Sequence, residues 1–305
     1  MTQSHPTGHV VDPDRVPDAP LVPPSANGGL SAVFKRRYLL RLLVRRELSA
    51  RYQATALGIL WSYIQPGIRF AMYFFVIGII IGMHHDVENY GVHVFAGFVF
   101  VHYFTEMFTA GTRSIIRNKA LVQKMAMPRE MFPVASVLVS AYHTLPSLLI
   151  LTVACLFSGW TPDAAGVAAG LLGFTLMTVL GVGLALLFSA ANVFFRDFQN
   201  IVGTLTNFIH FSVPMIYSYA IVSDRFGETG SKIWLLNPVA EAVLLIQRCF
   251  WVYSTPHPAK NLREGMPHDL FFRGFWMLAL ALLFLAFAQW VFTKLEGKFP
   301  ERLSS

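Results

Sequence analysis

The amino-acid sequence predicts an all-α, polytopic membrane protein with six transmembrane helices, a basic helix before the first and a short re-entrant helix before the last. Only 13% of the 305 residues are charged and 54% are hydrophobic, whereas soluble domains carry about 25% charged residues. A soluble domain of this size cannot enclose so much apolar surface in one core. Lipid must therefore cover part of it.

The apolar residues form six stretches that are long enough to cross a bilayer, for which a helix needs roughly 20 residues. The short loops 84–91 and 158–165 carry no Lys or Arg, while the segments on the other side carry 16. Basic residues are retained on the cytoplasmic side, so both termini are expected to be cytoplasmic. The predicted spans are 62–83, 92–112, 132–157, 166–192, 199–221 and 271–292.

The net charge of +7 does not indicate a nucleic-acid partner, because the basic residues flank the apolar spans. The two cysteines, Cys155 and Cys249, exclude a disulfide framework. The predicted parts are a disordered, proline-rich cytoplasmic tail (1–30), a basic interfacial helix (31–58), a transmembrane domain (59–295) with an inner loop (113–131) and an outer segment (222–269), and a cytoplasmic C-terminal tail (296–305).

The basic helix 31–58 carries seven Lys or Arg residues. A helix lying in the inner interface with snorkelling arginines fits this composition. Three interpretations remain open: a topology signal with anionic-lipid contact, a docking surface for a cytoplasmic partner, or a pyrophosphate-binding site. The candidates for the last are Arg37, Arg41, Arg45 and Arg51.

The inner loop 113–131 is predicted to contain a short helix that ends at Pro128. In a continuous helix Arg113, Arg117 and Lys124 would lie within about 40° of one another. A cytoplasmic helix with a basic face suits a place where another protein pushes on the membrane helices. A solvated loop helix is the alternative.

Ionisable groups within spans are rare and are functional candidates. On the second span His102, Glu106 and Thr109 form one polar stripe that continues to Arg113. Arg69 on the first span lies at the depth of Glu106, so an ion pair between them is expected, with a structural role favoured because each charge needs a partner in lipid.

The fifth span carries a polar and aromatic stripe that includes Asn207 and Phe211, which suits a helix lining a polar conduit. His102, His143 and His210 lie near mid-depth on different spans. A metal site would require these three to converge, and hydrogen-bonded lining is the favoured interpretation.

The outer segment contains an apolar helix that is expected to begin at Asn237-Pro238, with Asn as the N-cap and Pro at the first helical position. With about 14 residues it is too short to cross. It should be re-entrant or interfacial and is a candidate outer gate, with Asn237, Glu241 and Phe250 as its residues; an interfacial anchor is the alternative. Gly166 and Gly170 in span four are expected to serve helix packing within the chain rather than between subunits.

A nucleotide phosphate loop of the form GxxxxGK[ST] is missing from the sequence, since the one Gly-Lys pair, Gly297-Lys298, is followed by Phe299. The chain is therefore expected to be no enzyme and to carry no cofactor. ATP-driven transport would need an ATPase on another polypeptide, with ATP and Mg²⁺ bound there.

Four sequence motifs, in this order, resemble the permease subunit of ABC-type polysaccharide exporters of O-antigen, capsule and teichoic acid. They are Arg-Tyr-Gln to Gln-Pro (51–66), Arg-Asn-Lys to Pro-Arg-Glu (117–130), Asn-Val-Phe-Phe-Arg-Asp-Phe (192–198) and Asn-Pro-Val-Ala-Glu (237–241). The resemblance covers about 31–300, and the sequence looks most similar to actinobacterial galactan exporters.

The resemblance implies a homodimer in the plasma membrane that pairs with two copies of a cytoplasmic ATPase subunit. The substrate would be a glycan on a polyprenyl pyrophosphate, moved outward through a channel lined by polar and aromatic side chains. The residues expected to meet the ATPase are Arg113, Arg117, Lys124, Arg129, Arg196 and Asp197, and the expected channel-lining residues are Arg69, His102, Glu106, Thr109, Asn207 and Phe211.

Two other functions remain open from the sequence. A membrane-embedded glycosyl- or acyltransferase acting on a polyprenyl carrier would use Glu106, His102 and His143 as its interior acid–base groups. An ion-coupled secondary transporter would show matching broken helices in two halves, and the two halves of this sequence do not match convincingly.

Overall fold

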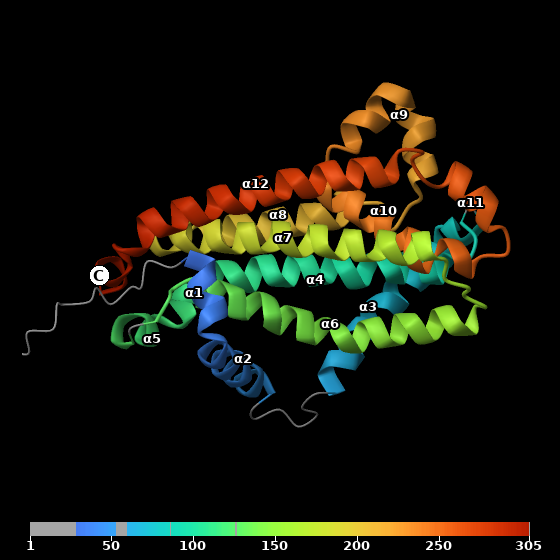
Figure 1. Ribbon diagram of the computed structural model, residues 1–305. Coiled ribbons are helices and arrows are strands. Elements are labelled where there is room, and N and C mark those ends of the chain that lie inside the picture. Colours follow the sequence, from blue (N-terminus) through green and yellow to red (C-terminus); the bar gives the residue numbers. More distant parts are fainter. Residues whose placement is uncertain (1–28, 53–59, 86, 126, 305) are drawn as a thin grey trace, which may run out of the picture.

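The computed structural model describes residues 29–52, 60–85, 87–125 and 127–304. All regular structure in these residues is helical, and the long helices run side by side as one bundle (Figure 1). The predicted all-α class is confirmed. Among the described residues five helices are long and apolar enough to span a membrane, or six if the bent pair Tyr219–Trp234 and Pro238–Ser254 counts as one span. The five are α3 with its continuation η2, α4 (Tyr90–Arg117), α6 (Met131–Phe157), α7 (Ala164–Phe194) and α12 (Leu270–Glu296).

The centre of the bundle is α4, which packs against α6, α7, α8 (Phe198–Ser212) and α10 (Pro238–Phe250). Small residues let α4 and α7 approach closely. A Cβ on Gly111 would lie 2.4 Å from the Cβ of Ala185, and one on Gly181 would lie 2.3 Å from the Met107 sulfur. Side chains larger than hydrogen at these two positions would force the helices apart.

The glycines of span four pack within the chain, as predicted. A Cβ on Gly166 or Gly170 would collide with Asp163 or Cys249, and one on Gly173 would lie 2.8 Å from the Ala242 carbonyl oxygen. These glycines therefore make room for α10, which lies along the outer half of α7.

The first span is bound much more loosely to the bundle. It consists of α3 (Trp61–Met72) and the π-helical η2 (Tyr73–Ile80). Gly78 lies against Tyr90, where an added Cβ would be 2.9 Å from the ring. In the first span only 11% of the most apolar stretch is buried inside the bundle, whereas in α4 the buried share is 78%.

The fifth span differs from the prediction of one continuous helix over 199–221. Helix α8 ends at Ser212, before Pro214, and α9 (Tyr219–Trp234) leaves the bundle sideways (Figure 1). Proline lacks an N–H and restricts the residue before it, so the helix stops there. Helix α9 bends at Gly227, whose φ of 65° favours glycine, and it meets α10 at an angle of 110°. The predicted short helix from Asn237 is α10.

The N-terminal basic segment forms two helices, α1 (Gly29–Lys35) and α2 (Arg37–Tyr52), where one was predicted. At the same end lie α5 (Lys119–Lys124) and α13 (Phe299–Ser304) (Figure 1). The charge distribution predicts this end to be cytoplasmic, and we call it the inner end. The predicted tail 1–30 lies outside the described residues except for Gly29 and Leu30.

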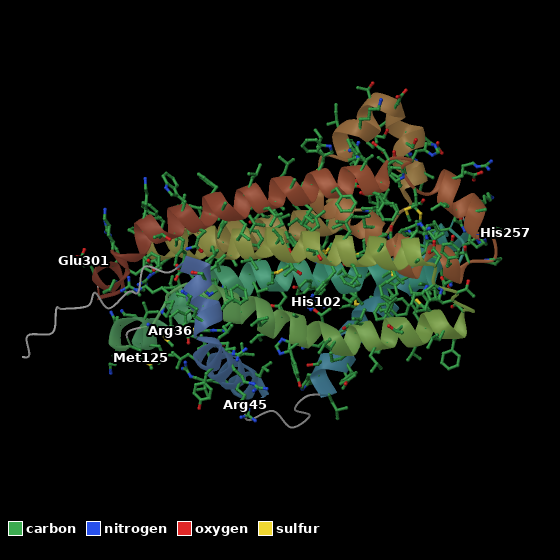
Figure 2. The ribbon with its side chains drawn as sticks, viewed as in Figure 1. Arg36, Arg45, His102, Met125, His257 and Glu301 are labelled. Atoms are coloured by element: carbon green, nitrogen blue, oxygen red, sulfur yellow. The ribbon has the colours of Figure 1, made fainter. Side chains whose placement is uncertain are left out.

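The opposite, outer end holds the short elements η3 (Met83–His85), η4 (Val252–Ser254) and α11 (Pro258–Glu264) (Figure 1). Figure 2 shows His257 at this end and Met125 and Glu301 at the inner end. One large apolar cluster fills the middle and outer part of the bundle around α4, α7 and α10, and a second one fills the inner end.

Candidate translocation path and coupling surface

A cavity of about 590 Å³ lies between the first span and α8, and we call it the central groove. Arg69 and Tyr73 line it from α3 and η2, and Asn207, His210 and Phe211 line it from α8. Three residues that the sequence predicted to line a conduit, Arg69, Asn207 and Phe211, therefore come together. Apolar wall residues Met72, Val76 and Ile77 complete the groove.

An aromatic ladder on α4 lies behind the groove. The His102 ring stacks on Phe98 with centroids 5.8 Å apart, and Phe98 contacts Tyr73 at 5.9 Å. Phe95 meets Phe70 of α3 at 4.7 Å. Phe95 and Phe98 are buried, so these rings hold the first span against α4.

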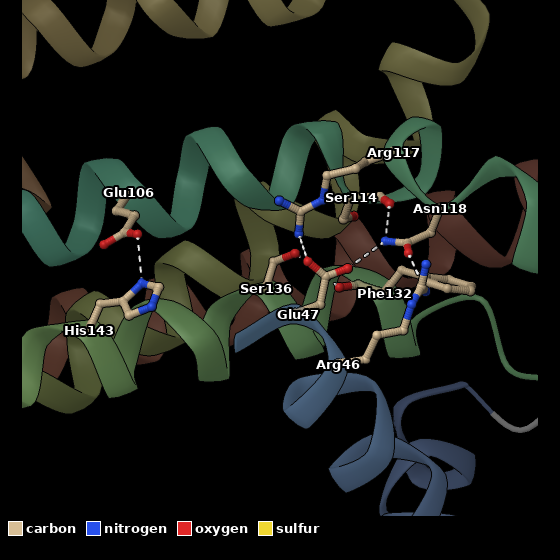
Figure 3. A network of polar contacts seen from close by, with 9 residues as sticks. All are labelled: Arg46, Glu47, Glu106, Ser114, Arg117, Asn118, Phe132, Ser136 and His143. Carbon is tan, nitrogen blue, oxygen red and sulfur yellow. Dashed lines mark hydrogen bonds and ion pairs between the residues drawn. The ribbon is translucent and has the colours of Figure 1, made fainter. Parts of the chain in front are cut away.

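Glu106 points away from this groove, toward α6. Its carboxylate lies 3.1 Å from the Nδ1 atom of His143 (Figure 3). The predicted ion pair between Glu106 and Arg69 is not found among the described residues. The prediction matched the depth of the two residues but not the face of α4 from which Glu106 projects. Thr109 is half-buried on the same helix.

A second cavity, of about 440 Å³, lies between α2, α4 and α6, and we call it the inner pocket. Glu106 and Ser140 line it at membrane depth, and Arg46, Glu47 and Arg117 line it at the inner end. The buried Ser140 hydroxyl has no hydrogen-bond partner among the described residues. The inner pocket thus extends from the inner end toward Glu106.

A polar network ties α2 to the end of α4 (Figure 3). Glu47 accepts hydrogen bonds from the Arg117 guanidinium and, at 3.1 Å, from the Asn118 side-chain amide. Arg46 donates to the Asn118 side-chain oxygen at 3.1 Å. Asn118 separates α4 from α5, so the basic helix is fastened to the point where the chain turns into the inner loop.

The break at Asn118 changes the prediction for the inner loop. Arg113 and Arg117 belong to the last turns of α4, while Lys124 belongs to α5. These three side chains therefore do not share the face of one continuous helix. Arg113, Lys124, Arg196 and Asp197 are nevertheless exposed at the inner end.

Arg129 lies elsewhere than predicted. Only 7% of its surface is exposed, and its guanidinium donates to the carbonyl oxygen of Glu296. Burial lowers the pKa of Arg129. The nearby carboxylates of Glu296 and Glu130 act in the opposite direction, but the net shift is downward. Arg129 thus joins the inner loop to the end of α12.

The candidate pyrophosphate arginines are divided between different places. Arg37 and Arg41 line a cavity of about 690 Å³ between α2 and α6, together with Tyr38, Leu138 and Tyr142. Arg45 follows one turn after Arg41 on α2 and is exposed, but it does not line this cavity (Figure 2). The side chain of Arg51 lies outside the described part of the chain.

The predicted outer gate helix, α10, is buried. Asn237 caps it, accepting hydrogen bonds from the N–H groups of Val239 and Ala240 at 3.0 and 3.4 Å. Glu241 is 0% exposed and lies 3.5 Å from Arg273 of α12. The Phe250 ring stacks on Trp160 at 5.7 Å. Helix α10 is therefore packed against α4, α7 and α12, and the choice between a re-entrant and an interfacial placement stays a prediction.

Two contacts at the outer end were not predicted. Arg248 of α10 binds both oxygens of Asp163, at 3.1 and 2.9 Å, and Asp163 caps α7 through the Gly166 N–H. Burial alone would raise the pKa of Asp163, but the hydrogen bonds from Arg248 and Gly166 bring it below the ordinary value. The two residues are 85 positions apart, so no local sequence signal connects them.

The second unpredicted contact joins the loop before α4 to the segment after α10. Glu88 accepts hydrogen bonds from Nδ1 of His257 and the Asn261 amide, both at 2.9 Å. Burial raises the pKa of Glu88, but these hydrogen bonds outweigh it and the net shift is downward. The two contacts therefore hold the C-terminal end of α10 and the segment after it to neighbouring elements.

The three histidines considered for a metal site contact different groups: His102 stacks on Phe98, His143 pairs with Glu106, and His210 accompanies Asn207 in the central groove. Within the described ranges, no group of three or more His, Cys, Asp or Glu side chains is arranged to hold a metal ion.

The arrangement of the spans and the buried helix α10 can be compared with known proteins. The family model described as "ABC-2 type transporter" matches residues 38–248, well over half of the chain. This chain belongs to the ABC-2 type transporter family. It is therefore a multi-pass plasma-membrane protein and a transporter subunit rather than an enzyme, which excludes the transferase interpretation of Glu106 and His143.

Characterised relatives agree with this assignment. The O-antigen export system permease protein RfbA of Klebsiella pneumoniae is 26% identical over 209 residues, covering 68% of this chain and 77% of the relative. The protein of the same name from Myxococcus xanthus is 26% identical over 224 residues, covering 73% and 84%. A further Klebsiella pneumoniae RfbA is 24% identical over 215 residues, covering 70% and 80%.

Proposed function

We propose that this ABC-2 permease exports a polysaccharide, carried on a polyprenyl pyrophosphate, from the cytoplasmic to the outer face of the plasma membrane. Its relatives from Klebsiella pneumoniae and Myxococcus xanthus are O-antigen export permeases, which supports this substrate class. The observation that carries the proposal is the central groove, where Arg69 of the first span and Asn207 and His210 of α8 line one cavity. Polar side chains at this depth are costly unless they face a polar path or a partner.

The same groove supports a homodimer. One copy leaves most of the first span exposed, including Ile68, Met72 and Phe75, beside the polar lining from Arg69 and Asn207. A second copy placed against this face would enclose the groove and shield Arg69 from lipid. Oligomers of identical subunits are most often two-fold symmetric dimers.

Transport requires energy from another polypeptide, because the sequence contains no phosphate loop. We infer that two copies of a cytoplasmic ATPase subunit, which bind ATP and Mg²⁺, dock at the inner end. The exposed basic residues Arg113, Lys124 and Arg196 suit such a contact. The network around Asn118 then connects the docking site with the basic helix.

The experiment that tests this function is reconstitution of the chain with the ATPase subunit encoded beside it. ATP-dependent appearance of a fluorescent polyprenyl-pyrophosphate glycan on the outer face of proteoliposomes is expected. Arg69→Met with Asn207→Leu should reduce transport at least tenfold, while Thr175→Val, an exposed polar-to-apolar change on α7, should not. Equal transport by these variants would contradict a path through the central groove.

Coupling to ATP is tested at the inner end. Arg113→Glu with Lys124→Glu should leave ATP hydrolysis by the complex measurable while transport per ATP falls, because the reversed charges weaken the docking contact. Unchanged transport per ATP would contradict this role.

The finer proposal for the substrate is a galactan used in cell-envelope assembly, which rests on the resemblance of the four sequence motifs to galactan exporters. Galactan and a mannose homopolymer on the same carrier should compete unequally for export. Equal competition would remove the galactan assignment and leave the exporter unaffected.

A further inference from the structure

The C-terminal residues were expected to form a tail, but they form a helix that packs under the inner loop. Phe299 is 0% exposed and Leu303 is 6% exposed, and both belong to the inner apolar cluster. The Phe299 ring lies 5.5 Å from Phe292 of α12 and 6.3 Å from Phe194 of α7. Helix α13 also contacts α5.

Arg129 joins these elements. Its guanidinium donates to the Glu296 carbonyl oxygen and lies 5.9 Å above the Phe299 ring. Next to it, Glu130 accepts a hydrogen bond from Gln289 of α12 at 3.0 Å. Two neighbouring residues after α5, Arg129 and Glu130, thus fix the inner loop to the last turns of α12, directly before α13.

The surface that results is basic. Of the charged residues in 119–124 and 298–304, four are basic, namely Lys119, Lys124, Lys298 and Arg302, and one is acidic, Glu301; all five are exposed. Both helices lie at the inner end of the bundle (Figures 1 and 2). Helices α5 and α13 contact each other, so their basic side chains lie on neighbouring elements, and the Arg302 guanidinium also lies 5.8 Å from the Phe194 ring of α7.

We propose that α5 and α13 together form the docking surface for the cytoplasmic ATPase subunit, and that Arg129 is the positioning residue that holds the two helices together. This rests on the proposed function, which supplies the partner, and it adds the C-terminal helix to the coupling machinery. The proposal therefore expects an acidic patch on that partner, because opposite charges across an interface favour association.

Anionic lipid is the competing occupant of this surface, and the packing of α13 argues against it. A helix that binds a membrane surface directs its apolar face into the lipid. In α13 that face, formed by Phe299 and Leu303, is already buried against α5, α7 and α12. A protein partner fits the remaining charged face better.

The test compares two charge reversals of equal size in the full chain, coexpressed with the ATPase subunit and purified in nanodiscs. Lys298→Glu with Arg302→Glu alters α13. Lys260→Glu with Arg263→Glu alters exposed residues of α11 at the outer end and is the matched control. In the α13 variant, association with the ATPase subunit should fall at least tenfold and should no longer depend on salt concentration. In the control variant, association should stay at the wild-type level.

Each other outcome has a distinct meaning. Wild-type-level association of the α13 variant, with a normal melting temperature, overturns the docking surface alone. A loss seen only in nanodiscs with anionic lipid overturns it in favour of lipid binding. Absence of ATPase association in the wild type overturns the proposed function together with this inference.

Arg129 is tested by its conservative variant, because a purely structural role would respond differently. Arg129→Gln should lower ATPase association and the stimulation of ATP hydrolysis, and Arg129→Lys, which retains a cationic donor for the Glu296 carbonyl, should restore most of both. If both variants lower the melting temperature equally and leave association unchanged, the positioning role is wrong.

Discussion

Helix α4 and the first span are consecutive membrane helices of similar composition, yet the bundle encloses one and leaves the other open. In α4, 78% of the most apolar stretch is buried, and in α3 with η2 only 11% is. Apolar composition places both in the membrane, but it does not say whether protein or lipid covers them. The open span also carries Arg69, which is why its exposed face is the place to expect a second subunit.

The largest effect expected from this difference concerns glycine. Gly111→Leu should lower the free energy of unfolding by about 3 kcal/mol, because even a Cβ there meets the Cβ of Ala185 at 2.4 Å. Gly67→Leu in α3 should not lower the free energy of unfolding, because no atom lies within 4 Å of a Cβ built at that position. Unfolding by SDS in mixed micelles measures both, and equal destabilisation would remove the contrast between the spans.

Gly67→Leu also tests the homodimer. Added bulk on the open face should shift the molecular mass of the detergent complex from dimer toward monomer without loss of fold. Mass photometry of the purified protein measures this. A Gly67→Leu protein that remains as dimeric as wild type would place the subunit contact on another face.

The second largest effect concerns the clamp between α10 and α7. Arg248→Ala should cost about 3 kcal/mol, because it leaves the Asp163 carboxylate without its bidentate partner. Arg263→Ala, an exposed arginine of α11, should change stability by less than about 0.5 kcal/mol. Thermal unfolding of the two variants compares them; a small loss for Arg248→Ala would mean that apolar packing alone holds α10.

A smaller effect separates the two faces of α4. Glu106→Gln and His143→Gln should show a coupling free energy of about 1 kcal/mol in a double-mutant cycle, since their side chains are 3.1 Å apart. Arg69→Ala and Glu106→Gln should instead be additive. Coupling between Arg69 and Glu106 would restore the pairing that the sequence alone suggested.

The smallest effect concerns pH at the outer end. The pKa values of Asp163 and Glu88 are lowered in the folded protein from ordinary values of 3.8 and 4.5. A lowered pKa means stabilisation that is complete above the ordinary value and is lost as the pH falls through the folded pKa. The melting temperature should therefore be insensitive to these groups at neutral pH and fall below about pH 4.

The combination of Asp163→Asn with Glu88→Gln provides the control for that pH dependence. Its melting temperature should fall less steeply in acid than that of the wild type, because two of the groups that bind protons on unfolding in this range are gone. If the melting temperature of the double variant fell as steeply in acid as that of the wild type, the acid destabilisation would come from other carboxylates.

The sequence by itself determined the features that depend on local composition. The apolar spans, the basic segments beside them, the cap at Asn237 and the end of α8 before Pro214 follow from hydropathy, charge and backbone chemistry along a few residues. The interruption of span five at that proline was readable in principle, because a polar stripe with a mid-span proline is the signal of a broken helix.

Only the tertiary structure decided which side chains meet. Equal depth suggested Arg69 for Glu106, but the rotation of α4 turns the carboxylate toward His143. Arg129 reads as a loop residue, and the fold buries it under α13. Asp163 and Arg248 are 85 positions apart. The physical reason is common to all three: hydropathy fixes how deep a residue lies, while packing against neighbouring helices fixes the direction in which its side chain points.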